Sequence, residues 1–368
     1  MKSKIFVIAL ACLLGLSLSA QSTTATAKVG LAGAQFLKIP IGGRATALDA
    51  AVMPLASGAS AVFSNPAGLN HITSTNSAFV ATSVWFADIT LNSGSYVRNF
   101  EGRGKVAVFF SQMNSGDMPI TTVDDQTGEN SGTFTSVSSV VGISGAKMFT
   151  DRFGVGLTTK IVTENMANGV GGDDFGKGSV LAIDIGTWYD TGIKGVKISA
   201  VVQNFGPEIT PQGIYYDYDR GDTITVSVPG DIYGTKDEIA QEFSFRPYSL
   251  PMVFNFGVAF SPMDNLDVSF TTVQPNDNLQ RYLVGVEYSL MGMAAFRGSY
   301  AFGGYPFMTG IDEDNNDESL YEDTFFGYDD RTFSGGLGLK FGKIGLDLAY
   351  IHHTFLDPVY NGSVNFSF

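Results

Sequence analysis

The stretch that decides the fold is Tyr360–Phe368, which reads YNGSVNFSF. Its even positions include Tyr360, Val364, Phe366 and Phe368, whereas its odd positions carry Asn and Ser. Because successive side chains of a strand point to opposite faces, this stretch predicts a strand with one apolar and one small polar face. Such a strand ending on Phe is typical of the closing strand of a transmembrane β-barrel, with Val364, Phe366 and Phe368 as its C-terminal signal. In a soluble β-sandwich the same alternation would be ordinary.

The same period of two recurs upstream. In Met252–Phe260 one face is unbroken and apolar, and in Phe153–Ile161 the apolar residues oppose Gly, Thr and Lys. A lipid-facing strand needs this alternation because lipid and lumen lie on its two sides. The sequence therefore predicts an all-β fold, a 14-stranded antiparallel transmembrane β-barrel over residues 77–368. The expected strands span 77–87, 89–100, 104–113, 134–149, 153–165, 179–190, 194–205, 250–261, 266–274, 280–290, 293–303, 331–342, 344–354 and 359–368.

The expected connections differ between the two ends of the barrel. Those after every second strand are short, such as Glu101–Arg103 and Thr150–Arg152, whereas the opposite connections include 206–249 and 304–330. Outer-membrane barrels show this asymmetry, with tight periplasmic turns and long external loops. An even number of strands also closes the sheet, which leaves no unpaired backbone edge in hydrocarbon. The regularity favours a barrel over a Greek-key sandwich.

The N-terminus predicts export. Lys2 and Lys4 precede the apolar run Ile5–Leu18, and small residues follow up to Ala20. This order is that of a secretory signal peptide, expected over residues 1–20. A transmembrane anchor is the alternative, but the run is short for a bilayer span. The expected location is the outer membrane, reached through the periplasm, with membrane lipid and lipopolysaccharide as surroundings.

Composition narrows the function classes. The chain has 44 Gly and 29 Phe, only 16% charged residues and a formal net charge of −14. An acidic exterior argues against a nucleic-acid partner, which needs a basic surface. The one cysteine, Cys12, lies in the expected signal peptide, so no disulfide is expected after export. Without a G-x-S-x-G motif or a complete phosphate loop, the sequence predicts a protein that is no enzyme and needs no cofactor.

Residues 21–76 depart from the barrel pattern. They contain Phe36–Arg44, many Ala and Gly, and the motif Asn65-Pro66-Ala67-Gly68. A barrel of fourteen strands encloses a lumen too wide for wall side chains to fill. This segment is therefore expected to lie in the lumen as a plug or hatch.

Two parts of that segment are candidate site residues. Arg44 stands alone among small and apolar residues, so a buried Arg44 would need a carboxylate such as Asp49 or Glu287. It would either hold the plug to the wall or contact a ligand. The motif Asn65–Gly68 is expected to form a tight turn in which the Asn side chain hydrogen-bonds to backbone.

The long loops hold two further candidates. Tyr215, Tyr216 and Tyr218 lie in the 206–249 connection and form either a partner-binding surface or interfacial aromatics.

In the acidic 304–330 connection, Asp312, Asp314 and Asn316 are spaced like the opening of a calcium loop, although Asp317 stands where the turn glycine is needed. A solvated loop facing lipopolysaccharide is the alternative there, and no metal site is firmly predicted.

Two stretches of the N-terminal segment resemble a known protein family. FLKIPIGGRATALDAAV at residues 36–52 and ASGASAVFSNPAGL at residues 56–69 resemble the N-terminal signature of the PorV/PorQ family, outer-membrane barrels similar to the fatty-acid transporter FadL. The chain departs from that pattern at Asp49-Ala50, where Gly-Gly is frequent, and at Ser57-Gly58, where an acidic pair is common. It also has Gly68-Leu69 where the dedicated secretion proteins carry Lys.

The resemblance implies two functions. As a PorV/PorQ protein, the chain would be a type IX secretion component that binds sorting-domain cargo or attachment-complex partners at the cell surface. As a FadL-like channel, it would pass a hydrophobic small molecule along a path bordered by Asn65. A soluble surface β-protein is a third class, which would extract from cells without detergent.

Overall fold

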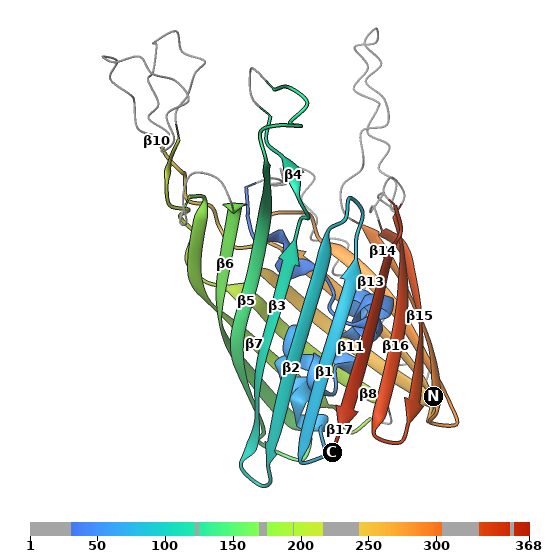
Figure 1. Ribbon diagram of the computed structural model, residues 1–368. Helices are drawn as coiled ribbons and strands as arrows, with labels where there is room; N and C mark the ends of the chain where they lie inside the picture. The colour runs from blue at the N-terminus through green and yellow to red at the C-terminus, as the bar shows by residue number, and fades with distance from the viewer. Residues whose placement is uncertain are drawn as a thin grey trace, which may run out of the picture.

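The computed structural model describes residues 31–121, 125–168, 175–193, 195–215, 243–303, 331–353 and 357–368. Across these residues, fourteen antiparallel strands follow one another around a closed wall, in which the first strand pairs with both the second and the last (Figure 1). The predicted 14-stranded barrel is confirmed. The wall strands are β1 (Asn76–Val84), β2 (Thr90–Phe100), β3 (Gly104–Asn114), β5 (Thr133–Met148), β6 (Phe153–Asn168), β7 (Lys177–Asp190), β8 (Val196–Phe205), β11 (Val253–Met263), β12 (Leu266–Pro275), β13 (Arg281–Leu290), β14 (Ala294–Gly303), β15 (Arg331–Phe341), β16 (Ile344–His353) and β17 (Val359–Ser367).

The closing strand β17 is the stretch from which the prediction began. It pairs with β1 so that Val364 lies opposite Val80 and Phe366 opposite Ala78. Phe366 and Phe368 are exposed on the outer face, whereas Ser363 is buried on the lumen side. The role of Val364, Phe366 and Phe368 as a C-terminal signal stays a prediction.

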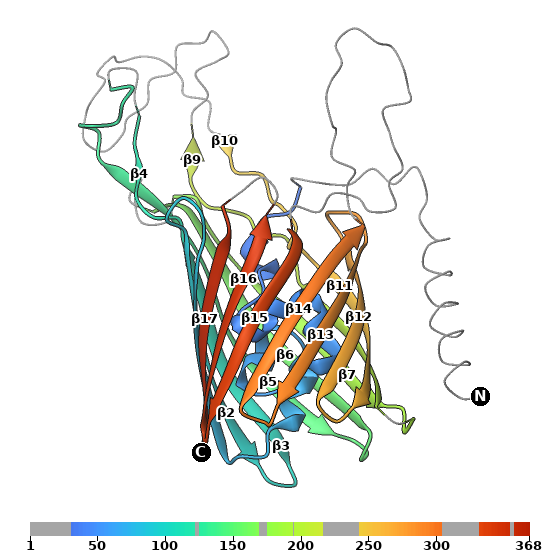
Figure 2. The ribbon, with the colours of Figure 1, turned by 90° about the vertical axis from the view of Figure 1, so that its right-hand side faces the viewer.

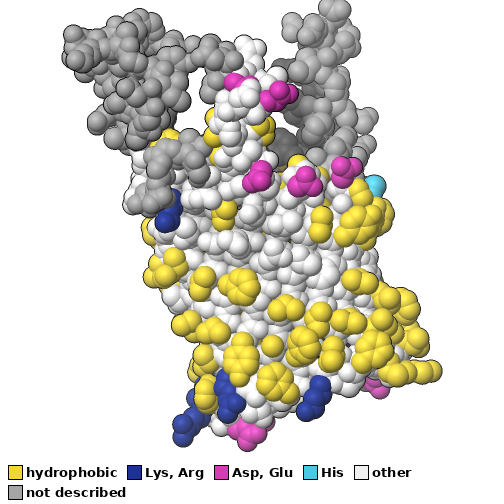
Figure 3. All heavy atoms as spheres, viewed as in Figure 1, with side chains coloured by type: hydrophobic (Ala, Val, Ile, Leu, Met, Phe, Trp, Pro, Cys, Tyr) yellow, Lys and Arg dark blue, Asp and Glu magenta, His cyan; other side chains and the backbone are white. Residues whose placement is uncertain are grey.

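The two faces of the wall have the chemistry that a membrane requires. Apolar side chains such as Val108, Ile143 and Leu348 are exposed on the outside. Figure 3 shows such side chains spread over the outer wall, with charged side chains gathered toward the two ends. Inward positions are mostly small or polar, as at Ser144 and Thr158, which hydrogen-bond to each other across β5 and β6. Lipid therefore contacts the apolar rows, and the backbone hydrogen bonds are satisfied within the closed sheet.

The ends of the barrel differ as expected. The turn end carries tight connections such as 101–103 and 342–343, and it also holds the end of β17. The loop end carries the longer connections, including the short strand β4 (Met118–Pro119) and the pair β9 (Ile214–Tyr215) and β10 (Phe243–Ser244) (Figure 2). Among the strands that begin later than predicted, β11 shows the largest difference, at Val253 rather than at residue 250. Pro251 has no backbone N–H to donate to the neighbouring strand, which delays the ladder.

Residues 31–75, here called the lumenal segment, lie inside the barrel (Figures 1 and 2). The segment starts at the loop end, where Gly33 N donates to Ser249 O, and reaches the turn end just before β1. Along its path it contacts strands on every side of the wall. Its elements are η1 (Gln35–Lys38), α2 (Gly43–Leu48), η2 (Asp49–Leu55), η3 (Ala59–Phe63) and η4 (Pro66–His71).

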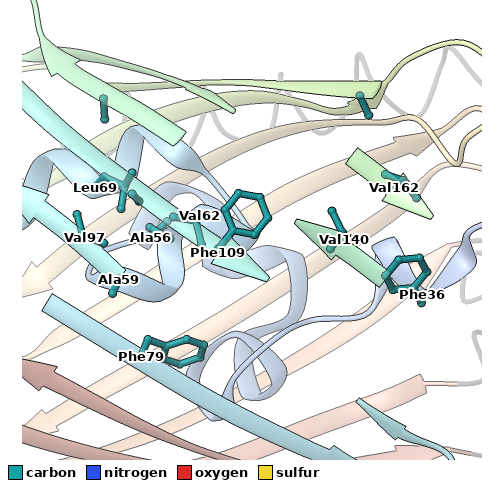
Figure 4. Close-up of a cluster of buried hydrophobic side chains, with 14 of the residues drawn as sticks. Phe36, Ala56, Ala59, Val62, Leu69, Phe79, Val97, Phe109, Val140 and Val162 are labelled. Carbon is teal, nitrogen blue, oxygen red and sulfur yellow. The ribbon is translucent and has the colours of Figure 1, made fainter. Parts of the chain in front are cut away.

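Small residues allow these short helices to fit. Ala47, Leu48 and Ala51 are fully buried between segment and wall. A larger apolar cluster joins Phe36 and Val62 of the segment to inward-facing wall residues such as Phe79, Phe109 and Val140 (Figure 4). The core of this protein therefore lies between the lumenal segment and the wall.

Within the described part of the chain, no helix has both the length and the apolar character needed to cross a membrane.

Candidate functional site

A pocket of about 200 Å³ lies toward the loop end, between the lumenal segment and strands β8, β11 and β12. Much of its lining is apolar, including Leu37, Ile39, Val52, Val253 and Val273. Seven of the nineteen lining residues are polar, and three of these, Lys38, Asp49 and Arg281, are charged. A small, mostly apolar pocket with a few placed polar groups is typical of a small-molecule site. We call it the loop-side pocket.

A second pocket, of about 620 Å³, lies toward the turn end. Its lining is more polar and includes Arg44, Glu287, Arg297, Lys340 and Asp347. We call it the turn-side pocket. Its size and charge suit water and ions rather than an apolar ligand.

Residues 41–45, Ile41-Gly42-Gly43-Arg44-Ala45, lie between these pockets and are called the strip. Ile41 and Ala45 line both pockets. Gly42 has a φ of 91° and packs against the Phe79 ring, where a Cβ would lie 2.5 Å from Cζ. Only glycine combines that backbone conformation with so close an approach. The strip is thus a thin wall of mostly small residues across the lumen.

A chain of buried ion pairs holds the strip to the barrel. Arg44 Nε donates to Glu287 Oε2 at 2.8 Å, and Arg297 Nε donates to the same oxygen at 2.6 Å. Arg297 Nη1 also donates to Asp347 Oδ1 at 2.6 Å. Glu287 is one of the two partners expected for Arg44. The four charges balance, so each buried ion has a counterion and hydrogen bonds, as burial requires.

The motif Asn65-Pro66-Ala67-Gly68 docks the far part of the lumenal segment on the wall. Asn65 is fully buried, and its Oδ1 accepts from Ala67 N at 3.0 Å, which caps η4. Its Nδ2 donates to Met53 O at 3.2 Å and to Thr187 O of β7 at 3.1 Å. The side chain thus makes the expected backbone hydrogen bonds and also joins two elements to the barrel. No part of the motif lines either pocket in the described residues.

Two glycines of the wall make room for this motif. Gly156 of β6 and Gly186 of β7 lie opposite each other in the sheet. A Cβ on Gly156 would overlap Pro66, and one on Gly186 would overlap Asn65 Oδ1. The plug motif therefore rests directly on wall backbone, which no residue larger than glycine would allow.

A polar cluster in the wall is complete without any ligand. Lys160 Nζ donates to Asp184 Oδ2 at 2.7 Å and to Asn204 Oδ1 at 2.6 Å. Asn204, at φ 61° in a bulge of β8, donates its backbone N–H to Asp184 Oδ1 at 2.7 Å. Because these buried groups satisfy one another, the cluster fixes the local shape of the wall.

Unlike the cluster around Lys160, the side chain of Asn255 in β11 has one atom without a hydrogen-bond partner in the described part of the chain. Gln203 Nε2 donates to Phe63 O and Ser64 O, at 3.3 and 3.1 Å, which uses both of its hydrogens. Gln203 Oε1 must then face Asn255, whose Nδ2 donates to it at 3.0 Å. Asn255 Oδ1 has no hydrogen-bond partner among the described residues, although Asn255 is only 1% exposed. Asn255 therefore lines the pocket with an amide whose oxygen is itself almost wholly buried.

At the loop end, two groups outside the strands have shifted pKa values. Burial, with a hydrogen bond to Glu164, raises the pKa of Tyr248, whose hydroxyl donates to Glu164 Oε2 at 2.6 Å. The ring of Tyr248 packs over Gly33 and holds the start of the lumenal segment. Hydrogen bonds from Asn130 N, the Ser131 hydroxyl and further donors lower the pKa of Asp125 to about 2. Asp125 therefore stays ionised and organises its own loop.

Most of the candidate residues in the long loops lie outside the described part of the chain. The backbone of Tyr215 belongs to β9, whereas Tyr216 and Tyr218 lie outside the described residues. Asp312, Asp314 and Asn316, the calcium candidates, lie outside them as well. Over the ranges that are described, no group of three or more His, Cys, Asp or Glu side chains could hold a metal ion.

Sequence reasoning missed the most informative residues of this site. Gln203 and Asn255 are ordinary polar members of an alternating strand, and their meeting depends on the β8–β11 register. Gly156 and Gly186 carried a weak signal, because each is a glycine on an inward-facing row. Arg44 was predicted as a site residue because it is a lone basic residue in an apolar segment, and a buried base needs a carboxylate partner.

We compared the chain with family models, with curated proteins and with solved structures. No protein-family model matches the chain. A search of curated proteins also gives no match.

Solved structures do match over most of their length. A CymD monoaromatic hydrocarbon channel aligns with a TM-score of 0.57 at 13% identity, covering 90% of this chain and 98% of that one. The toluene transporter TodX of Pseudomonas putida aligns with a TM-score of 0.54 at 12% identity, covering 93% and 99%. A FadL homologue of Pseudomonas aeruginosa aligns with a TM-score of 0.50 at 14% identity, covering 90% and 99%. At these identities the likeness concerns the fold alone, and the chain has the fold of the FadL-like outer-membrane channels.

Proposed function

We propose that this protein is a channel that lets small hydrophobic molecules cross the outer membrane. The observation that carries the proposal is the pair of pockets separated by the strip, with Ile41 and Ala45 lining both. A molecule entering from the loop end would occupy the loop-side pocket, pass the strip and leave through the turn-side pocket. The lumenal segment acts as the plug of this path.

The chemistry of the two pockets fits that direction of transport. The apolar part of the loop-side pocket, with residues such as Ile39, Val52 and Val253, offers an apolar solute an environment better than water. The turn-side pocket offers charged groups, which bind such a solute poorly and favour its release. The fold likeness to hydrocarbon channels such as CymD and TodX supports the same function.

Uptake by intact cells tests the proposal. The full-length chain is produced in a strain whose own hydrocarbon channel has been deleted, and initial uptake of labelled toluene and labelled maltose is measured. We expect toluene uptake to rise and maltose uptake to stay at the background rate. Equal entry of both solutes would indicate an open pore, and entry of neither would overturn the proposal.

Filling the loop-side pocket is expected to block this uptake. Val273 of β12 is 5% exposed and lines that pocket, so Val273→Trp places a large ring in the space a solute would use. We expect toluene uptake to fall by about tenfold or more, because the indole ring occupies the space that the solute needs and a loss of about 1.4 kcal/mol in binding is already tenfold. The matched control is Val286→Trp, since Val286 of β13 faces outward and is 40% exposed. Equal loss in both variants would show that the pocket is not on the path.

The secretion role implied by the PorV/PorQ resemblance stays a prediction. Its support is the string FLKIPIGGRATALDAAV at residues 36–52, which here builds η1, the strip and α2. The comparisons favour the channel. A pull-down from detergent extract that recovers type IX components or sorting-domain cargo would support the secretion role, and recovery of neither would count against it.

A further inference from the structure

The outer wall near the turn end carries two charged side chains that face the membrane. Of the charged residues in the turn-end half of the described wall strands, only Arg98 of β2 and Lys147 of β5 point outward, and both are exposed. The others alternate inward: Lys105, Asp190, Lys197, Asp267, Glu287, Arg297, Lys340 and Asp347. In Figure 3, most Lys and Arg side chains of this face lie at the turn end. A charge at lipid level is costly without a partner, so these two bases mark a polar contact on an apolar wall.

The strand register places the two bases near each other. Arg98 lies opposite Val106, and Val106 lies opposite Gly145. Lys147 is two residues farther along β5, so its Cα lies about 10 Å from that of Arg98 across the sheet and about 7 Å along it. Between them β3 contributes Val106 and Gly104, and no atom lies within 4 Å of a Cβ added at Gly145. Because Arg and Lys side chains are long, both charged ends can contact one group that lies between them.

Neither base has an acidic partner among the described residues. Arg98 Nη1 donates to the neutral Asn76 Oδ1 at 2.7 Å, and Tyr96 OH donates to the same oxygen at 2.8 Å. This contact holds the guanidinium on the wall and leaves further N–H donors on Arg98 available. The Lys147 side chain makes no hydrogen bond or ion pair with the described part of the chain.

The neighbouring turns do not neutralise the two bases. Glu101 and Arg103 lie in the turn between β2 and β3, and Asp151 and Arg152 lie in the turn between β5 and β6. Each turn therefore carries one acid and one base. The two positive charges of the wall remain in excess at this place.

Aromatic residues show the level of the membrane interface here. Phe100 follows Arg98 by two positions and is 47% exposed, and Phe149 follows Lys147 by two positions and is 67% exposed. Exposed aromatic rings gather at the boundary between hydrocarbon and headgroups. Lipid phosphates lie at that boundary, within reach of both bases.

We propose that Arg98 and Lys147 together bind the phosphate of one anionic phospholipid from the leaflet at the turn end. The phosphate accepts charge-assisted hydrogen bonds from both side chains, and the acyl chains lie along the apolar outer rows of β3 and β5, against Val108 and Ile143. Two bases favour a headgroup with a net negative charge, such as phosphatidylglycerol, over a zwitterionic one. The site lies on the outer face of the wall, so it does not depend on what the lumen carries.

Native mass spectrometry of the full-length barrel, released from detergent after titration with lipid, tests the proposal. Phosphatidylglycerol and phosphatidylcholine with the same acyl chains are the two probes, and each gives a dissociation constant. One basic residue near an anionic headgroup contributes about fivefold in affinity. We therefore expect the wild-type protein to bind one phosphatidylglycerol about 25-fold more tightly than phosphatidylcholine. Equal affinity for the two lipids would overturn the proposal.

Charge variants assign the preference to the two residues. Arg98→Gln and Lys147→Gln should each lower it about fivefold, whereas Arg98→Lys and Lys147→Arg should keep most of it. The matched control is Lys197→Gln, which removes a positive charge at the same end from an inward position of β8 and should leave the preference unchanged. Heat-modifiable mobility on gels verifies that each variant is a folded barrel. An equal loss in Lys197→Gln would show a general effect of charge and would overturn the site.

A water-soluble competitor separates a lipid site from a site for free phosphate. Glycerol 3-phosphate has a phosphate but no acyl chain, so it should not displace phosphatidylglycerol at equal concentration. Displacement would show that the two bases bind small anions from solution, and the lipid assignment would be wrong.

Discussion

Replacing Gly186 with valine is expected to force the lumenal segment off the wall of the barrel. The new Cβ would overlap Asn65 Oδ1 and would lie 2.9 Å from Pro66 Cδ. Asn65 would have to move, and it would lose its hydrogen bonds to Ala67 N, Met53 O and Thr187 O. Overpacking and the lost hydrogen bonds together should lower the free energy of unfolding by about 3–6 kcal/mol.

Two measurements report this effect. Urea unfolding, followed by the heat-modifiable mobility of the folded barrel, gives the stability, and planar-bilayer conductance reports an opened lumen. The matched control is Gly145→Val on β5, where no atom lies within 4 Å of the added Cβ and the side chain faces outward. That variant should stay within about 0.5 kcal/mol of wild type. Wild-type stability and conductance in Gly186→Val would show that the motif is not docked on this glycine.

Replacing Glu287 with glutamine is expected to loosen the strip. Glu287 accepts from Arg44 and from Arg297, and its side chain is 10% exposed. Arg297 keeps Asp347, but Arg44 loses its ion-pair partner and keeps neutral acceptors such as the Ser57 hydroxyl, to which it donates at 2.8 Å. Breaking a buried ion pair from one side costs about 3–5 kcal/mol, so a loss of about 3 kcal/mol is expected, with raised bilayer conductance.

A double variant separates the ion pair from general damage at this position. Arg44→Met combined with Glu287→Gln removes the unpaired charge as well, and it should recover part of the stability lost in the single variant. Conductance should remain high, because the strip has still lost its tie to β13. Glu101→Gln, in the exposed turn between β2 and β3, is the control for a charge change alone. Additive losses in the double variant would indicate that the two residues do not act as a pair.

The fold was predictable because the pattern that encodes it is local. The alternation of apolar and polar residues within Tyr360–Phe368 can be recognised without knowing the partner strand. It repeats in other strands because each has lipid on one side and the lumen on the other. The largest error at a strand start comes from a proline, at Pro251. The bulge at Asn204 leaves the predicted end of β8 unchanged, but its extra residue shifts the alternation of side chains, so that Asn204 is buried and Phe205 is exposed.

The site was less predictable because it depends on register and on long separations in sequence. Arg44 and Glu287 are 243 residues apart, and the pairing was anticipated only because a lone buried base needs a carboxylate. Gln203 and Asn255 meet because Val253 lies opposite Gln203, which places the two amides diagonally across the sheet. Nothing in the sequence of either strand specifies that offset.

The course of residues 31–75 through the lumen also constrains how the protein is built. These residues enter at one rim and leave at the other, where they continue directly into β1. The seam between β1 and β17 joins the first and last strands of the wall. Its partner residues are the farthest apart in the sequence, so forming this pairing closes the longest chain loop and costs the most conformational entropy. A chain that zipped this seam first would have to thread its own leading residues through a finished cylinder. Insertion into the bilayer must therefore gather the wall around these residues, and the seam closes last.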